Sequence, residues 1–312
     1  MTVRSLTTPS QPNTKTQIAG DFMTNTSKDP IVVIGATGQQ GSATVDASVD
    51  RGMAVRALTC SVDSAAARAL AGRGVEVVEA DLDAPDSIRR AFEGAGAAFA
   101  MTSFLGPRGV DGEVAHGKVI VEAAHAAQLP FLVYSSVGGA ERKSGVPHFE
   151  SKRRVEEFLI GAVPANIIRP TFFMENLLEM IDRKDGKLAF SMAMPGNVPL
   201  QMISVRDIGS VAATLLVRRD SAAAPVEIAG DEVSGEQIAN LVAQRFGESA
   251  TFVELPLDVF GDDDDGRAMF RWFSDPPSYR ADFARTRDLG DDVEDLSRWL
   301  ARQPSPYSEA QS

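Results

Sequence analysis

The chain has 312 residues, 44% of them hydrophobic, and a formal net charge of −12 at pH 7. This size allows one large core or two unequal cores, and the acidic balance argues against a nucleic-acid-binding surface, which needs clustered Lys and Arg. The single cysteine excludes a disulfide framework and fits a reducing compartment. No apolar run is long enough to cross a membrane, so we expect a cytoplasmic protein without a membrane partner.

The first 29 residues are rich in Thr, Ser, Asn and Gln and contain no apolar core of a signal peptide. A polar segment of this kind cannot bury enough apolar surface to fold. We therefore expect residues 1–29 to be a disordered extension. Met23 is an alternative translation start, just ahead of the first predicted strand.

The stretch that organises the chain begins with four apolar residues at 31–34, which predict a buried strand. Gly35, Gly38 and Gly41 follow, and residues 42–51 predict a helix. In a dinucleotide site, the first glycine permits a tight turn, the second allows backbone to approach a pyrophosphate, and the third lets the helix pack against the sheet. The strand before and the helix after are the context that this motif requires. The candidate cofactor contacts in this turn are Gly35, Thr37, Gly38, Gln39, Gln40 and Gly41.

Strand and helix patterns then alternate along the chain. The predicted strands cover residues 53–58, 75–79, 97–102, 131–135 and 165–169, and the predicted helices cover residues 63–73, 83–93, 110–128 and 149–160. Alternation at this spacing predicts βαβ units with right-handed crossovers. We expect an α/β fold with a doubly wound parallel sheet, in which residues 30–170 form the dinucleotide-binding domain.

The regular alternation stops after Pro170. We expect a helix at residues 172–181 and a loop-rich stretch at 184–200, without enough alternation for a second full sheet. Further helices and strands are predicted at residues 207–217, 226–229, 234–246 and 251–255. Residues 171–312 should form mainly a smaller, interrupted C-terminal lobe, with some segments returning to the large sheet. The four acids at residues 262–265 are typical of a solvated loop rather than of a metal site.

The end of the second predicted strand bears on cofactor choice. NAD-specific sites carry a carboxylate about 20 residues after the glycines, which binds the ribose 2′-hydroxyl. This strand ends in Thr59, Cys60 and Ser61, and no acid occurs before Asp63. Without that carboxylate a 2′-phosphate is permitted, so the sequence slightly favours NADP over NAD.

A second group of polar residues lies around the fifth strand. Ser136 follows the strand end, where ligand-facing groups of open α/β sheets gather. His148 and Lys152 have i, i+4 spacing and therefore share one helix face. Lys152 can hold ribose hydroxyls, the alternative being an exposed cation beside Arg153 and Arg154. His148 can donate a proton, although it is equally consistent with a surface position at the helix N-terminus. His116 and His125 have no acid or cysteine at ligand spacing, so we expect no metal site.

Five segments resemble the NmrA-like family of the atypical short-chain dehydrogenase/reductase superfamily. They are GATGQQG at residues 35–41, DLD at 81–83, VYSS at 133–136, HFESK at 148–152 and RPTFFMEN at 169–176. The similarity spans roughly residues 30 to 260 and implies a Rossmann fold that binds NAD(P) across the strand ends. By this resemblance Lys152 would bind the nicotinamide ribose. The remaining implied contacts are Asp81 and Leu82 with the adenine, Thr102 and Ser103 with the dinucleotide, and Phe172 and Asn176 with the nicotinamide region.

Two positions depart from the superfamily pattern. The catalytic tyrosine, four residues before the lysine, is replaced by His148, as in NmrA-type members that bind the cofactor without known turnover. Ser136 keeps the position of the catalytic serine. NADP-binding members often carry an arginine after the second strand's threonine, where this chain has Cys60.

Two functions remain open from the sequence. The first is an NAD(P)H-dependent reductase of a small quinone, carbonyl or conjugated substrate, with Lys152, His148 and Ser136 as catalytic candidates. The second is a redox sensor, whose dinucleotide occupancy changes a surface that a protein partner recognises. The reductase is narrowly favoured.

Overall fold

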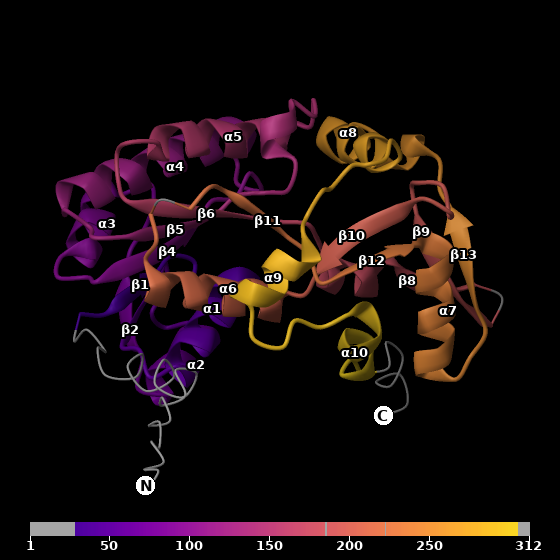
Figure 1. Ribbon diagram of the computed structural model, residues 1–312, viewed down its shortest axis with the longest axis horizontal. Helices are drawn as coiled ribbons and strands as arrows, with labels where there is room; N and C mark the ends of the chain where they lie inside the picture. The colour runs from indigo at the N-terminus through magenta and orange to yellow at the C-terminus, as the bar shows by residue number, and fades with distance from the viewer. Residues whose placement is uncertain (1–28, 185, 222, 305–312) are drawn as a thin grey trace, which may run out of the picture.

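The computed structural model describes residues 29–184, 186–221 and 223–304 (Figure 1). The extension predicted for residues 1–29 lies outside these residues, except for Asp29. Within the described residues, none of the helices combines the length and the apolar character that a membrane span requires.

A seven-stranded sheet in the order β11-β6-β5-β4-β1-β2-β3 forms the centre of the molecule, and all six strand pairs are parallel. The α/β doubly wound fold predicted from the sequence is therefore confirmed, with the 3-2-1-4-5-6 strand order of dinucleotide-binding folds. The strands are β1 (Ile31–Val33), β2 (Val55–Thr59), β3 (Glu76–Glu79), β4 (Ala97–Met101), β5 (Leu132–Ser135), β6 (Ala165–Pro170) and β11 (Val226–Ile228).

Helices cover both faces of this sheet (Figure 1). Side chains of a strand alternate between its two faces, and Ile31 and Val33 pack with Ile208 on one face while Val32 packs with Phe92 on the other. Both faces are buried, which explains why the strand sequences are continuous apolar runs. The helices are α1 (Gln39–Asp50), α2 (Ala65–Gly72), α3 (Pro85–Phe92), α4 (Gly109–Ala126), α5 (Pro147–Leu159) and α6 (Val205–Arg218).

A separate apolar core lies beyond the end of the large sheet, among two small sheets and the C-terminal helices. One small sheet has the order β12-β10-β7 and the other β13-β9-β8. Their strands are β7 (Phe172–Phe173), β8 (Ile181–Lys184), β9 (Lys187–Met192), β10 (Pro199–Ile203), β12 (Asp231–Ser234) and β13 (Ala250–Glu254). The helices of this part are α7 (Gly235–Phe246), α8 (Asp264–Phe273), α9 (Phe283–Leu289) and α10 (Leu296–Ala301), and short 3₁₀ helices are η1 (Ala140–Arg142), η2 (Met174–Met180) and η3 (Leu257–Phe260).

Three sequence predictions were wrong in detail. The helix expected at 172–181 is strand β7 followed by the 3₁₀ helix η2, because Phe172 pairs with Met202 of β10 and this tertiary pairing overrides local helix propensity. The loop-rich stretch at 184–200 contains β9, whose central residues are buried and therefore show no clear alternation. The acidic run expected to be a solvated loop caps and begins α8.

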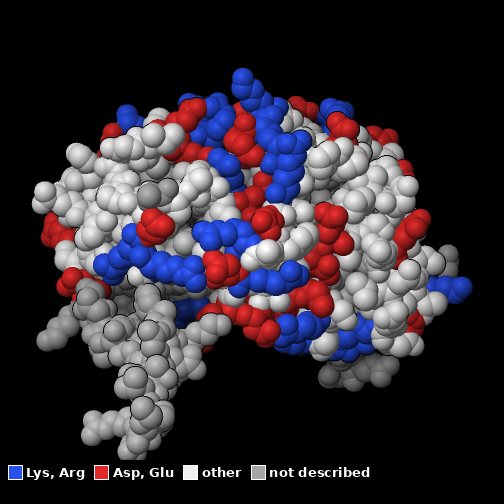
Figure 2. Space-filling model, viewed as in Figure 1, with Lys and Arg blue, Asp and Glu red and all other residues white. Residues whose placement is uncertain are grey.

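Charged side chains of both signs are interspersed on the face seen in Figure 2. Several arginines in the C-terminal third pair with carboxylates, as Arg218 does with Asp288 and Arg298 with Asp292. Exposed pairs of this kind contribute less than about 1 kcal/mol each. Stability must therefore come mainly from the two cores and from close helix packing.

The closest helix packing joins α1 and α6 across one face of the large sheet. Gly209 of α6 lies against the backbone of Ala43 in α1, and a Cβ atom at position 209 would stand 2.4 Å from the Ala43 carbonyl carbon and oxygen. Backbone atoms cannot yield as a flexible side chain can. Only glycine therefore allows α6 to approach α1 this closely.

We predict that Gly209→Ala lowers the free energy of unfolding by about 1–3 kcal/mol, because the added methyl group overpacks the α1–α6 contact. Chemical denaturation measures the change. Gly72→Ala is the matched control, because a Cβ at this helical glycine meets nothing within 4 Å. Equal stability of the two variants would contradict the packing argument.

Candidate functional site

The turn between β1 and α1 lies where the order of strands reverses, since β1 pairs with β2 on one side and β4 on the other. Ligands of open α/β sheets bind outside the strand ends at such a point. Gly35 has a φ of +67°, and a Cβ on Gly41 would stand 2.0 Å from the Gly35 carbonyl oxygen. The helix therefore begins directly against the turn, three residues before the predicted start.

The N-terminus of α1 has the properties of an anion site. Gly38 is the N-cap residue and makes no side-chain cap, and the first helical turn contains no acid. Its first N–H groups, on Gln39 and Gln40, are therefore not neutralised by a neighbouring carboxylate. The helix dipole and these donors together favour a negatively charged group.

A cavity of about 550 Å³ opens beside this helix end, where the carboxyl ends of β4 and β5 meet α5, η2 and α8. It brings together residues that are far apart in the sequence. The candidate site residues that line it are Gln39, Gln40, Thr102, Ser103, Ser136, His148, Lys152, Phe172 and Asn176.

The other candidates do not line this cavity. They lie in the β1–α1 turn and after the neighbouring strands β2 and β3, at the same carboxyl edge of the sheet. They are Gly35, Thr37, Gly38, Gly41, Thr59, Cys60, Ser61, Asp81 and Leu82. This separation suits a ligand longer than the cavity, with one end in it and the other across β2.

Lys152 is buried at the floor of the cavity and held by two groups. Its Nζ donates to the Thr102 carbonyl oxygen at 2.6 Å and lies 3.1 Å from Glu113 Oε1. Burial lowers the pKa of Lys152, and the Glu113 carboxylate opposes this shift. A ligand hydroxyl would therefore meet an ammonium whose position is already fixed.

Glu113 connects several polar groups under the cavity, although the sequence analysis did not identify it. This carboxylate is fully buried in α4 and accepts hydrogen bonds from Thr102 Oγ1 at 3.1 Å and from Ser151 Oγ. Thr102 Oγ1 also bonds to the Tyr134 hydroxyl at 2.8 Å, and burial raises the pKa of Tyr134 well above its usual value. In the sequence, Glu113 is visible only as an acid on the apolar face of a predicted helix. Such an acid cannot be assigned a role until the group that pairs with it is known.

His148 lies one helical turn before Lys152 on α5, lines the same cavity and contacts the C-terminal part of the chain. Its Nδ1 lies 2.5 Å from Asp265 Oδ2, and its backbone N–H donates to Asp265 Oδ1 at 2.8 Å. Phe104 stacks on the imidazole with ring centroids 4.6 Å apart. The surface position that the sequence left open for His148 is therefore not observed.

Ser136 has a buried hydroxyl at the cavity that bonds to no other protein group that the structure describes. Its side chain is buried and lines the cavity, but its Oγ has no hydrogen-bond partner within the described chain. A buried hydroxyl without a partner costs roughly 1–3 kcal/mol, so such groups usually face a ligand or water. Neighbouring Ser135 differs, because its Oγ donates to Gln40 Oε1 at 2.6 Å.

Aromatic side chains and polar groups share the walls of the cavity. Among the aromatic residues, Phe172 was a candidate from the sequence. The others are Phe104 of the loop after β4, Phe149 of α5, Phe173 of β7, Phe260 of η3 and Tyr279. These rings suit a flat, conjugated molecule, and Ser136, His148 and Lys152 are among the polar groups that it would meet.

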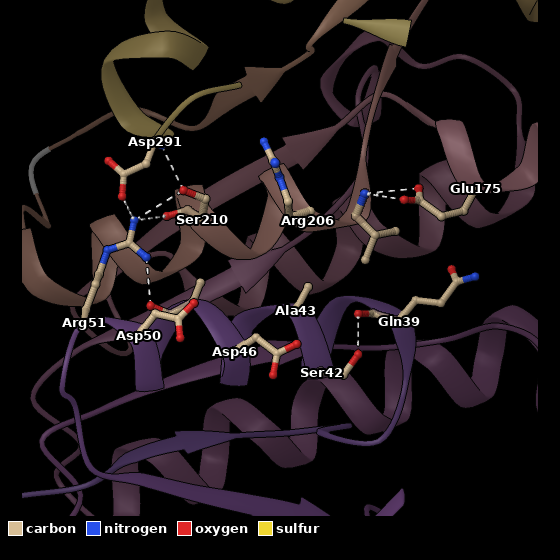
Figure 3. A pocket seen from close by; sticks show the side chains of 12 residues that line it. Gln39, Ser42, Ala43, Asp46, Asp50, Arg51, Glu175, Arg206, Ser210 and Asp291 are labelled. Carbon is tan, nitrogen blue, oxygen red and sulfur yellow. Dashed lines mark hydrogen bonds and ion pairs between the residues drawn. The ribbon is translucent and has the colours of Figure 1, made fainter. Parts of the chain in front are cut away.

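A second cavity of about 580 Å³ lies between α1 and α6 (Figure 3). Its arginines are bound within the fold: Arg51 pairs with Asp291, and Arg206 donates to the Asp292 carbonyl oxygen at 2.7 Å. Glu175 accepts the Val205 N–H at 3.0 Å. These groups stabilise contacts between chain segments, so we place the candidate site in the first cavity.

The strand order, the glycine turn and the cavity at the switch point define a Rossmann-type α/β protein. The NmrA-like family model matches residues 27–280, and the chain belongs to this family. The family resemblance read from the sequence is thereby confirmed.

Individual relatives show similarity of differing extent. The oxidoreductase FrzB of Cladobotryum sp. is 35% identical over 163 residues, 47% of this chain, and the match spans about half of the relative's length (48%). An NAD(P)H azoreductase of Xenophilus azovorans is 28% identical over 233 residues, covering 73% of this chain and 78% of the relative. The solved structure of NmrA, a negative transcriptional regulator in complex with NAD, superposes with a TM-score of 0.75 at 18% identity, covering 88% of this chain and 95% of that chain.

We predict that Glu113→Gln lowers the free energy of unfolding by about 3–5 kcal/mol, because it leaves the Lys152 ammonium buried without its counter-charge. Denaturant titration at neutral pH measures this loss. Glu122→Gln is the control, since the Lys118–Glu122 pair is exposed and its loss should cost under about 1 kcal/mol. If both variants lost a similar free energy of unfolding, the Glu113 carboxylate would not be needed to compensate the buried charge of Lys152.

Proposed function

We propose that the chain binds a nicotinamide dinucleotide, with the pyrophosphate at the β1–α1 turn and the nicotinamide in the aromatic cavity. The uncapped N-terminus of α1 and the unpartnered Ser136 hydroxyl support this placement. The azoreductase relative is named for NAD(P)H, and the NmrA structure contains NAD. Lys152 would hold the nicotinamide ribose, while the ends of β2 and β3 would receive the adenosine.

The choice between NAD and NADP depends on the surroundings of Cys60. Parallel pairing places Glu79 of β3 opposite Thr59, and Asp81 follows two residues later. Partial burial, then the carboxylates of Asp81, Asp83 and Glu79, raise the pKa of the Cys60 thiol, which indicates that negative charge gathers around it. A 2′-phosphate there would be repelled. We therefore propose that NAD(H) binds at least as well as NADP(H), against the slight preference for NADP inferred from the strand end alone.

We predict that Cys60→Arg raises the affinity for NADP(H) relative to NAD(H) by about 10-fold, because a guanidinium pairs with phosphate and offsets the carboxylates. Calorimetric titration of both dinucleotides gives the ratio. Cys60→Ala should keep the ratio of the unaltered protein. An unchanged ratio in Cys60→Arg would place the adenosine ribose elsewhere.

We propose that the protein is a reductase of flat, conjugated acceptors such as quinones or azo compounds. The observation that carries this proposal is one cavity combining aromatic walls, a buried hydroxyl without a partner and an imidazole held by a carboxylate. A bound reduced dinucleotide supplies the hydride. Among the relatives, FrzB is named an oxidoreductase and the Xenophilus azovorans protein an NAD(P)H azoreductase.

Each protein group has a separate task in this reaction. Ser136 Oγ donates a hydrogen bond to the acceptor oxygen or nitrogen, which polarises the conjugated system toward hydride addition. The His148 imidazolium donates one proton to the developing anion. Hydride and proton together convert a quinone to a hydroquinone, and the neutral imidazole then regains its proton from solvent. Phe104 and the other aromatic walls exclude water from the acceptor.

The test of this function is His148→Phe, with menadione as acceptor and NADH or NADPH as donor. We expect kcat to fall about 10²-fold or more, the usual contribution of a general acid, while dinucleotide affinity changes little. Stopped-flow absorbance at 340 nm measures turnover, and calorimetry measures affinity. Unaltered turnover in His148→Phe would remove His148 from the mechanism.

A redox sensor is the second candidate, supported by the likeness to NmrA, whose structure is described as that of a negative transcriptional regulator. A sensor must distinguish oxidised from reduced dinucleotide, since a ligand shifts an equilibrium only by its differential affinity. The two candidates therefore differ in a measurable way. A sensor shows strong discrimination between redox states and no turnover, whereas the reductase turns over acceptors.

A further inference from the structure

At the cavity, the N-terminal end of α8 contacts the beginning of α5 through hydrogen bonds of the Asp265 side chain. Asp265 contacts His148 twice, through Oδ1 to the backbone N–H at 2.8 Å and through Oδ2 to Nδ1 at 2.5 Å. The two residues are 117 positions apart. The Asp265 side chain is only 18% exposed and that of His148 12%, so water competes little for this contact.

The two contacts have different consequences. The first satisfies a backbone donor in the first turn of α5, which has no side-chain cap of its own. The second determines which ring nitrogen carries the hydrogen, because a carboxylate only accepts and Nδ1 must therefore donate. In the neutral ring, Nε2 is then the free base, and in the imidazolium Nε2–H is the free acid.

Two phenylalanine rings also pack against the His148 imidazole. Phe104 stacks on it at an interplanar angle of 15°, and Phe149 meets it edge-on at 87°. Since Nδ1 is bound to Asp265, Nε2 is the nitrogen available to a ligand, and it makes no hydrogen bond to any part of the chain that the structure describes. The imidazole is therefore oriented before any substrate binds.

Other charges face the cavity near this ring. Asp263, the N-cap of α8, and Glu113 of α4 are acidic, while Lys152 of α5 is basic and already paired with Glu113. Of the charged groups that the structure describes at the cavity, the Asp265 carboxylate is the one in direct contact with the ring.

We propose that Asp265 is the positioning partner of His148, fixing the Nδ1–H tautomer and leaving Nε2 as the nitrogen that serves the substrate. The claim that His148 carries its hydrogen on Nδ1 depends only on these contacts. The claim that this tautomer matters for turnover rests on the reductase function proposed above. From the sequence, residues 262–265 were expected to be a solvated loop rather than a metal site, and Asp265 was not among the candidate site residues.

The test uses nitrogen-15 NMR of the histidine rings at alkaline pH, where the neutral tautomers are distinguishable. The chain contains three histidines, so single substitutions assign every signal. We expect His148 to be Nδ1–H in the unaltered protein and Nε2–H in Asp265→Asn. The asparagine oxygen can keep the backbone contact while its amide group donates to Nδ1, which separates the tautomer from the cap.

His116 provides a matched control, because its Nε2 lies 3.1 Å from Asp83 Oδ1 in an exposed pair. Asp83→Asn should alter the His116 signals and leave those of His148 unchanged. An Nε2–H tautomer of His148 in the unaltered protein, or one that does not change in Asp265→Asn, would overturn the proposal. Should Asp265→Asn fail to fold, Asp265→Glu, which keeps the carboxylate, must retain the Nδ1–H tautomer.

The kinetic arm compares the same variants with NADH and menadione. We expect Asp265→Asn to lower kcat at least about 10²-fold, the lower end of what a correctly placed general acid contributes, with KM for NADH within about twofold of the unaltered value. A shifted tautomer with unchanged kcat would overturn the catalytic part. If the unaltered protein reduces no menadione, the reductase proposal fails for this acceptor, and the NMR result still decides the positioning of His148.

Discussion

The structure depends on the contact between Gly41 and the turn at Gly35. A Cβ at position 41 would stand 2.0 Å from the Gly35 carbonyl oxygen, so only glycine allows α1 to begin this close to β1. That approach sets the uncapped helix end at the point where the strand order reverses. The anion site, the adjoining cavity and the direction in which a dinucleotide would lie all follow from it.

The cavity is completed by two parts of the chain with separate cores. The large sheet contributes Ser136 and, through α5, His148 and Lys152, while the C-terminal elements contribute aromatic walls and Asp265. Each polar residue from the sheet side meets a different environment. Lys152 is paired with Glu113, His148 is bound to Asp265 of the C-terminal part, and Ser136 Oγ has no hydrogen-bond partner among the described residues.

The sequence predicted the parallel sheet correctly because buried β-branched strands alternate with helices, a local pattern that does not depend on tertiary partners. It also identified His148, Lys152 and Ser136, because motif spacing and strand ends are local too. It could not identify Glu113 or Asp265, whose meaning depends on partners 39 and 117 positions away in the chain. The strand β7 was mistaken for helix for the same reason, since its pairing with β10 is not visible in its own residues.

The most direct test is a calorimetric titration of the unaltered protein and of Gly38→Val with NAD⁺, NADH, NADP⁺ and NADPH. A Cβ at Gly38 would stand 3.4 Å from the Gly35 oxygen, which the fold tolerates, but it would occupy the place of the pyrophosphate. The account predicts that the unaltered protein binds at least one dinucleotide, that Gly38→Val binds none, and that the remote control Gly72→Val retains binding. Absence of binding by the unaltered protein, or full binding by a folded Gly38→Val, would contradict it.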